Sequence, residues 1–156
     1  MGTIAKAYAT IGEGQNHFRQ NLSGSGASPL VLLHPSPASS VSMQGLMEAL
    51  GDDRRLIAFD TPCNDQSCPP NVSEPEIAHF ADMLDQACDA LGLNKIALHD
   101  THTGAHIAPH WAVAQPGRVK LFSLDGRALL SASEREEMLA HYAQPREPDA
   151  YDSQFS

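Results

Sequence analysis

Histidines gather in one short stretch of this sequence. Four of the eight lie within twelve residues, namely His99, His102, His106 and His110. The last three are spaced by four, so they would share one face of a helix that began at His102. Histidines at i and i+4 can chelate zinc, and Asp100 would add a third ligand. No recognisable spacing supplies a fourth ligand, and Pro109 should disturb the helix before His110. We therefore expect these histidines to be polar residues at the border of a pocket. We expect no metal ion and no cofactor.

Cysteine is the second residue type with chemical potential, and the chain has three: Cys63, Cys68 and Cys88. Their odd number and the lack of a framework spacing predict reduced thiols, which are typical of a cytoplasmic protein. The interval between Cys63 and Cys68 resembles no metal or redox motif, so we interpret both as loop residues.

Composition limits the class of protein to which these residues belong. The 156 residues fit one domain, and 42% hydrophobic residues are enough for a buried core. Lys and Arg number 10 against 19 Asp and Glu, a formal charge of −9, which argues against nucleic acid or an anionic membrane as partner. We find no signal-peptide pattern and no apolar run of bilayer length. The expected partner is a small-molecule substrate.

Short apolar runs alternate with helical patterns, which predicts a parallel sheet covered by helices. Continuous apolar runs are typical of strands buried on both faces. They predict strands at residues 30–33, 55–59, 95–98 and 119–124. Residues 7–11 and 17–22 flank a Gly-Glu-Gly-Gln-Asn loop and predict an N-terminal hairpin.

Helices are predicted where apolar residues recur every three or four positions. The segments are residues 43–50, 73–91, the stretch that follows residue 105 and runs to 114, and about 133–142. Capping-box spacing occurs at Ser73 with Glu76 and at Ser133 with Glu136, and Gly92 is a suitable terminator. The tail, residues 144–156, is rich in Pro, Asp and Ser and is interpreted as a loose segment.

Three segments resemble the α/β-hydrolase fold superfamily. Leu32-Leu33-His34-Pro35 looks like the strand ending in His-Gly that forms one side of the oxyanion hole. Residues 57–62 look like the next strand with its Asp-x-Pro turn, and residues 94–119 look like the strand, nucleophile elbow and helix that follow.

This resemblance covers roughly residues 8–130. It implies an α/β three-layer sandwich with a mostly parallel sheet, truncated to about six strands of the usual eight. Residues 1–130 would form the N-terminal part of the hydrolase core, and residues 131–156 the start of a lid segment or a loose tail.

The nucleophile elbow has the pattern Gly-x-Ser-x-Gly, and the matching residues are Asp100-Thr101-His102-Thr103-Gly104. His102 therefore occupies the nucleophile position, and the segment also resembles a subgroup with a Gly-x-His-Thr-Gly-Ala elbow. Imidazole titrates near neutral pH, so a histidine there can act as nucleophile or general base. Asp100 replaces the first glycine of the pattern, which should tighten the turn.

The resemblance also implies an oxyanion hole made by the backbone N–H groups of Ser36 and Thr103. Pro35 replaces the glycine after His34 and has no N–H to donate. We expect His34 and Asp100 to border the same pocket.

Hydrolases of this type place their acid and catalytic histidine after the nucleophile. Asp125, at the end of the strand 119–124, is the one candidate acid, and an ordinary turn residue before Gly126 is the alternative. His141 in the last predicted helix is a poor substitute for the late histidine.

Three functional interpretations stay open. The chain could hydrolyse a small ester-like or related carbonyl substrate around His102. It could instead be a non-catalytic ligand-binding or scaffold protein on the same fold. The third possibility is an inactive fragment without the C-terminal acid and histidine. In that case the strand 119–124 would be an unpaired apolar edge, through which a homo-oligomer could form.

Overall fold

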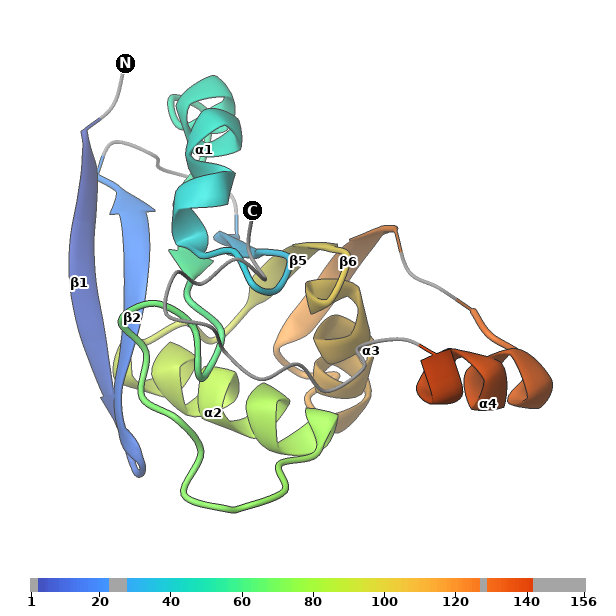
Figure 1. The fold of residues 1–156 in the computed structure, drawn as a ribbon. Helices are drawn as coiled ribbons and strands as arrows, with labels where there is room; N and C mark the ends of the chain where they lie inside the picture. The colour runs from blue at the N-terminus through green and yellow to red at the C-terminus, as the bar shows by residue number, and fades with distance from the viewer. Residues whose placement is uncertain (1–2, 23–27, 127–128, 142–156) are drawn as a thin grey trace, which may run out of the picture.

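A mixed six-stranded sheet forms the centre of the molecule (Figure 1). The computed structural model describes residues 3–22, 28–126 and 129–141. Its strands are β1 (Ile4–Ile11), β2 (Gly14–Asn21), β3 (Leu30–Leu33), β4 (Leu56–Phe59), β5 (Ile96–Thr101) and β6 (Val119–Asp125). Their order is β1-β2-β4-β3-β5-β6. The pairs among β3, β4, β5 and β6 are parallel, whereas β1 and β2 join antiparallel. The α/β class and the mostly parallel sheet are therefore confirmed.

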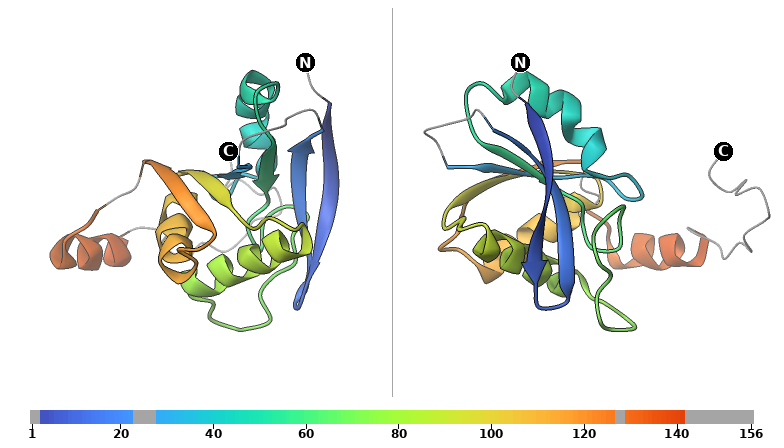
Figure 2. Two further views of the ribbon diagram at one scale, coloured as in Figure 1. Left: turned by 180° about the vertical axis from the view of Figure 1, so that it is seen from behind. Right: turned by 90° about the vertical axis from the view of Figure 1, so that its left-hand side faces the viewer.

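Helices cover both faces of this sheet, as Figure 2 shows from two further directions. They are η1 (Ser40–Met43) and α1 (Gln44–Leu50) on one face and α2 (Ile77–Ala90) and α3 (Gly104–Ala114) on the other. The last helix, α4 (Ala132–His141), projects away from the sheet (Figure 1). The α2 and α3 side holds the larger core, centred on the fully buried Trp111, Phe59 and Leu98. A smaller core on the opposite face joins Met47 of α1 to Leu32. Two cores separated by one sheet make the three layers.

The central strands form where the sequence is apolar without interruption. All four residues of β4 are buried, and β3 is buried from Val31 to Leu33. Since side chains alternate between the faces of a strand, a run of this kind needs a covering layer on each side. The parallel pairing of β3 with both β4 and β5 brings their carboxyl ends to one edge of the sheet.

Two segments begin differently from the prediction. The helix expected from residue 73 starts at Ile77 with Glu76 as an N-cap that makes no side-chain capping bond. Pro75 explains the shift, because the residue before a proline disfavours the helical region. The hairpin strands are longer than expected, with Ile11 paired to Gly14 across a two-residue turn.

The last helix, α4, is capped two residues earlier than predicted. The Ser131 N–H donates to Glu134 Oε2 at 2.8 Å, and the Glu134 N–H donates back to Ser131 Oγ at 3.3 Å. These reciprocal bonds make a capping box at Ser131 and Glu134 in place of Ser133 and Glu136. No residue of α4 is buried. The predicted tail, 144–156, lies outside the residues that the structure describes.

Strand β6 is an edge strand of the sheet, and several of its apolar side chains are exposed to solvent. Val119 is buried, but Leu121 is 68% exposed, Phe122 43% and Leu124 38%. Its only neighbour among the strands of the described ranges is β5. Within the described ranges, residues 119–125 are therefore an apolar edge, at the strand 119–124 for which the fragment interpretation expected one. Across the described ranges, no helix is long and apolar enough to cross a membrane.

Candidate active site

The turn between β5 and α3 holds His102 in a left-handed backbone conformation. Its φ is 55°, and in the described chain the other non-glycine residues with positive φ are Cys63 and Asp65. The His102 N–H donates to the carbonyl of Asp125 at 2.7 Å, and its own carbonyl accepts from the Ala105 N–H. A positive φ costs a non-glycine residue about 1 kcal/mol or more. The turn is therefore held in place by neighbouring backbone.

Gly104 explains how this turn can approach the sheet so closely. A Cβ built there would lie 2.9 Å from the Cβ of Leu33, 3.1 Å from its carbonyl oxygen and 3.2 Å from the Cβ of Asp100. Only a residue without a side chain fits at the first position of α3. The contact brings the start of α3 beside the carboxyl end of β3.

Ser36, Thr103 and His102 are linked by side-chain hydrogen bonding. The Ser36 N–H donates to Thr103 Oγ1 at 2.6 Å. Thr103 Oγ1 also lies 3.2 Å from His102 Nδ1. The structure thus brings together three residues that the sequence singled out. The Ser36 N–H, which was expected to face an oxyanion, donates to the Thr103 hydroxyl.

A pocket of about 320 Å³ opens beside this group. It is lined by His34, Ser36, Thr61, Pro62, Cys63, Asn64, Ile77, Phe80, Thr103, Gly104 and Ile107. These residues come from the loops that follow β3 and β4, from the turn between β5 and α3, and from helices α2 and α3. Ligand sites in open α/β sheets typically lie outside the carboxyl ends of the strands, and this pocket has that position.

His34 is a buried wall of the pocket. Its Nε2 accepts from the Thr61 N–H at 3.0 Å, and its Nδ1 bonds the carbonyl of Pro35 at 2.8 Å. Burial lowers the pKa of His34, outweighing the opposing effects of the Pro35 carbonyl, Asp60 and Asp65. A neutral His34 that joins two loops is a positioning group for the pocket.

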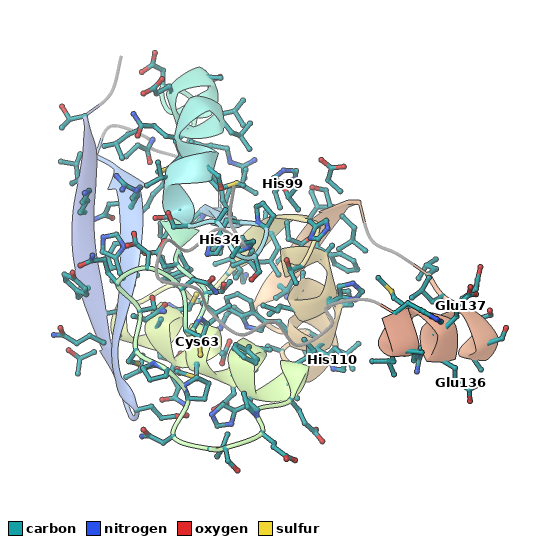
Figure 3. All side chains as sticks on the ribbon, viewed as in Figure 1. His34, Cys63, His99, His110, Glu136 and Glu137 are labelled. Carbon is teal, nitrogen blue, oxygen red and sulfur yellow. The ribbon has the colours of Figure 1, made fainter. Side chains whose placement is uncertain are left out.

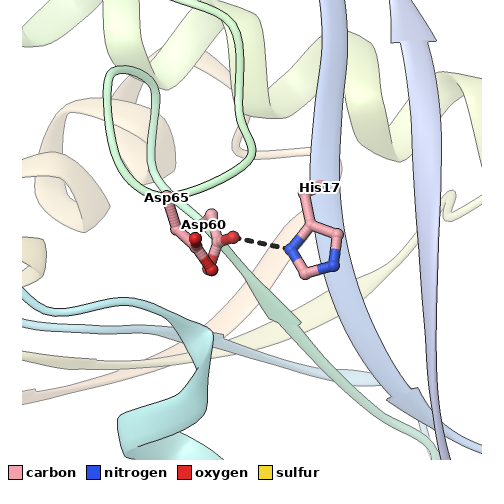
Figure 4. A group of neighbouring side chains, drawn as sticks. All are labelled: His17, Asp60 and Asp65. Atoms are coloured by element: carbon pink, nitrogen blue, oxygen red, sulfur yellow. Dashed lines mark hydrogen bonds and ion pairs between the residues drawn. The ribbon is translucent and has the colours of Figure 1, made fainter.

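Asp60 stabilises the same region through hydrogen bonds of its carboxylate. Its carboxylate accepts from the Ser40 N–H at 2.6 Å and lies 2.6 Å from His17 Nδ1 (Figure 4). Burial acts to raise the pKa of Asp60, but the hydrogen bonds from Ser40 and His17 outweigh it and lower the pKa overall. The charged carboxylate therefore joins the middle of β2, the end of β4 and the start of η1.

His17, Asp60 and Asp65 also form a group whose ligand atoms lie within 4.8 Å of one another, as a metal site would require. Two ligands of one ion, each bonded at about 2.0–2.2 Å, stand about 3 Å or more apart. The 2.6 Å between Nδ1 and Oδ2 is instead a direct hydrogen bond. We interpret the group as a buried hydrogen-bonded pair, His17 and Asp60, with Asp65 at its border.

The histidine cluster of the sequence does not assemble. Helix α3 begins at Gly104, so His102 lies outside it. His99 bonds Ser123 Oγ at 2.8 Å, and Figure 3 shows His99 and His110 well apart. No set of three metal-ligating atoms from His99–His110 meets within 4.8 Å in the part of the chain that the structure describes.

Asp100 and Asp125 take roles different from those expected. Asp100 is completely buried in β5 and does not line the pocket. Asp125 is exposed, and it holds His102 through its backbone carbonyl. No hydrogen bond or ion pair joins the Asp125 carboxylate to His102 within the described ranges.

Sequence reasoning missed part of the pocket wall. Phe80 and Ile77 were predicted as the apolar face of a helix, yet both line the pocket. Cys63 was interpreted as an ordinary loop residue, but its exposed thiol lies at the same site with φ 70°. Its position directly after the Asp-x-Pro turn was the one available signal.

Comparison with known proteins agrees with this architecture. The sequence profile described as the alpha/beta hydrolase fold matches residues 28–120, and the chain belongs to that family. A proline iminopeptidase from Heyndrickxia coagulans is 26% identical over 117 residues, which are 74% of this chain and 40% of that protein.

Solved structures of related enzymes superimpose well. A haloalkane dehalogenase from Agrobacterium tumefaciens is 27% identical with a TM-score of 0.68, over 78% of this chain and 40% of its own. An epoxide hydrolase from Vigna radiata is 20% identical with a TM-score of 0.74, over 89% of this chain and 46% of its own. The chain thus spans about two fifths to one half of the length of these relatives, in keeping with a truncated sheet.

Proposed function

We propose that this protein hydrolyses a small ester-like or related carbonyl substrate, with His102 at the reactive turn. The observation that carries the proposal is the conformation of His102, which a buried strand, a helix and the Asp125 carbonyl hold at φ 55°. Unfavourable backbone conformations persist where the surrounding structure imposes them, and they cluster at active sites.

The pocket next to His102 supports the same reaction. Its volume of about 320 Å³ suits a small substrate, and Ile77, Phe80 and Ile107 supply apolar walls. Backbone N–H groups near a reacting carbonyl stabilise the oxyanion of its tetrahedral intermediate. Ser36 and Thr103 are the proposed donors, because both line the pocket at the turn.

The relatives favour hydrolytic chemistry, but their names do not agree on one substrate. The named neighbours comprise a peptidase, an epoxide hydrolase and a dehalogenase. The resemblance to a subgroup with histidine at the elbow stays a prediction. On this proposal His102 acts as nucleophile or general base without a partner acid from Asp125.

A steady-state assay with short p-nitrophenyl esters tests this proposal. His102→Ala should lower kcat/KM by about 100-fold or more, the usual contribution of a positioned acid–base group. His110→Ala is the matched control, since His110 is exposed on α3 and does not line the pocket. Activity that survives His102→Ala would remove His102 from the mechanism. A wild-type chain without activity that still binds small ligands would support the non-catalytic interpretation.

A further inference from the structure

We infer that the Thr103 hydroxyl is the nucleophile of this site and that His102 Nδ1 is its general base. The inference rests on the proposed hydrolytic function and names the atom that attacks. It divides the chemistry between two adjacent residues, where the sequence pattern alone pointed to the imidazole.

The hydrogen bonds around Thr103 carry the inference. A hydroxyl has one proton to donate and two lone pairs to accept with. Oγ1 accepts from the Ser36 N–H at 2.6 Å and lies 3.2 Å from His102 Nδ1. In the tautomer of His102 that carries its proton on Nε2, Nδ1 accepts the Thr103 proton. A hydroxyl that donates to an imidazole nitrogen is the arrangement that activates a weak oxygen nucleophile.

The placement of the two side chains agrees with these roles. Thr103 lines the pocket together with Ser36 and His34. His102 is exposed and is not among the residues that line the pocket. A carbonyl bound in the pocket would therefore lie beside Thr103, whereas His102 lies outside the lining and reaches the site through Thr103 Oγ1.

The reaction balances with water as the only co-substrate. Thr103 Oγ1 attacks the carbonyl carbon as its proton passes to His102 Nδ1, and the carbonyl π electrons move onto the oxygen. The carbonyl re-forms, the bond to the alkoxide breaks, and the alkoxide takes the proton from His102. Water then attacks the acyl-Thr103 ester with His102 as base, the bond to Oγ1 breaks, and Oγ1 recovers its proton.

Ser36 contributes to the same step through its N–H. Negative charge moves from Oγ1 to the oxyanion, and these two oxygens are bonded to one carbon in the tetrahedral intermediate. A donor that starts at Oγ1 is therefore already close to the atom where charge develops. This makes the Ser36 N–H a stabilising group for both the nucleophile and the intermediate.

Covalent labelling with diisopropyl fluorophosphate tests the inference on the whole chain. Trypsin cleaves after Lys95 and Arg118, so one peptide, residues 96–118, contains both candidates, and fragmentation separates an adduct on Thr103 from one on His102. We expect the adduct on Thr103 in the wild type and on the serine of Thr103→Ser. Thr103→Val, which keeps the branched shape without the hydroxyl, should lose the label and about 100-fold or more of ester hydrolysis.

Two controls separate chemistry from folding. Thr10→Val makes the same change at an exposed position of β1 and should label like the wild type. His102→Ala should label about 100-fold more slowly, still on Thr103. Fluorescence of the buried Trp111 reports whether each variant is folded.

The contrary results are distinct. An adduct on His102, or unchanged labelling and hydrolysis in Thr103→Val, would overturn the assignment of the nucleophile while leaving the proposed function in place. A wild-type chain with neither an adduct in residues 96–118 nor ester hydrolysis would overturn both.

Discussion

Alanine at Gly104 should loosen the turn that carries the candidate site. The added Cβ would lie 2.9 Å from the Cβ of Leu33, whereas carbon atoms in good contact are about 3.5–4.0 Å apart. Something must move by roughly 0.6–1 Å, and the nearest atoms belong to β3 and β5, which are packed on both sides. Overpacking of this kind costs about 1–3 kcal/mol of unfolding free energy.

Gly45→Ala is the matched control for this change. Gly45 is exposed in α1, and a Cβ there would meet nothing within 4 Å. Alanine should therefore stabilise the chain by up to about 1 kcal/mol through its higher helix propensity. Urea unfolding followed by the single tryptophan, Trp111, measures both changes. A Gly104→Ala protein as stable as the wild type would refute the close approach of the turn to β3.

Three further outcomes follow from the contacts. Asp85→Ala removes the partner of the Trp111 indole N–H, at 2.7 Å, and of Arg118 Nε, at 2.9 Å. It should cost about 3 kcal/mol and lower Tm by about 6–12 °C in thermal unfolding, whereas an unchanged Tm would show the pair to be dispensable. Because the pKa of His34 is lowered in the folded state, its stability contribution is present above the unfolded pKa of about 6.5 and is lost as pH falls below it. His34→Gln should flatten this loss in unfolding curves between pH 7 and pH 5, and an unchanged pH dependence would show that another group is responsible. We also propose that the apolar edge β6 pairs with the β6 of a second copy, since among the described strands β6 has a partner, β5, on one side only. Leu121→Lys should then shift the sedimentation of an oligomer to that of a monomer, and a monomeric wild type would contradict the pairing.

Much of the fold could be predicted because its signals are local. Residues 30–33 and 56–59 are apolar at every position, which is typical of a strand that is covered on both faces. The position of His102 between a strand and a helix followed from the same reasoning. The predicted start of α2 was wrong. Ser73 and Glu76 have the spacing of a capping box, but Pro75 between them prevents the helix from beginning at residue 73.

The chemistry of the site was less predictable because it depends on contacts between distant segments. The bond from the Ser36 N–H to Thr103 Oγ1 joins residues 67 positions apart. Asp125 was considered for its carboxylate, but its carbonyl is what holds His102, a contact set by the register of β6. Backbone acceptors of this kind have no signature in the residue type.

The most direct test of the central claim is a crystal structure of the chain after reaction with a small organophosphonate ester. Our account predicts phosphorus bonded to the Thr103 hydroxyl, in the pocket lined by His34 and Phe80, with a phosphonyl oxygen within hydrogen-bond distance of the Ser36 N–H. An empty pocket, or phosphorus bonded to any residue other than Thr103, would contradict it.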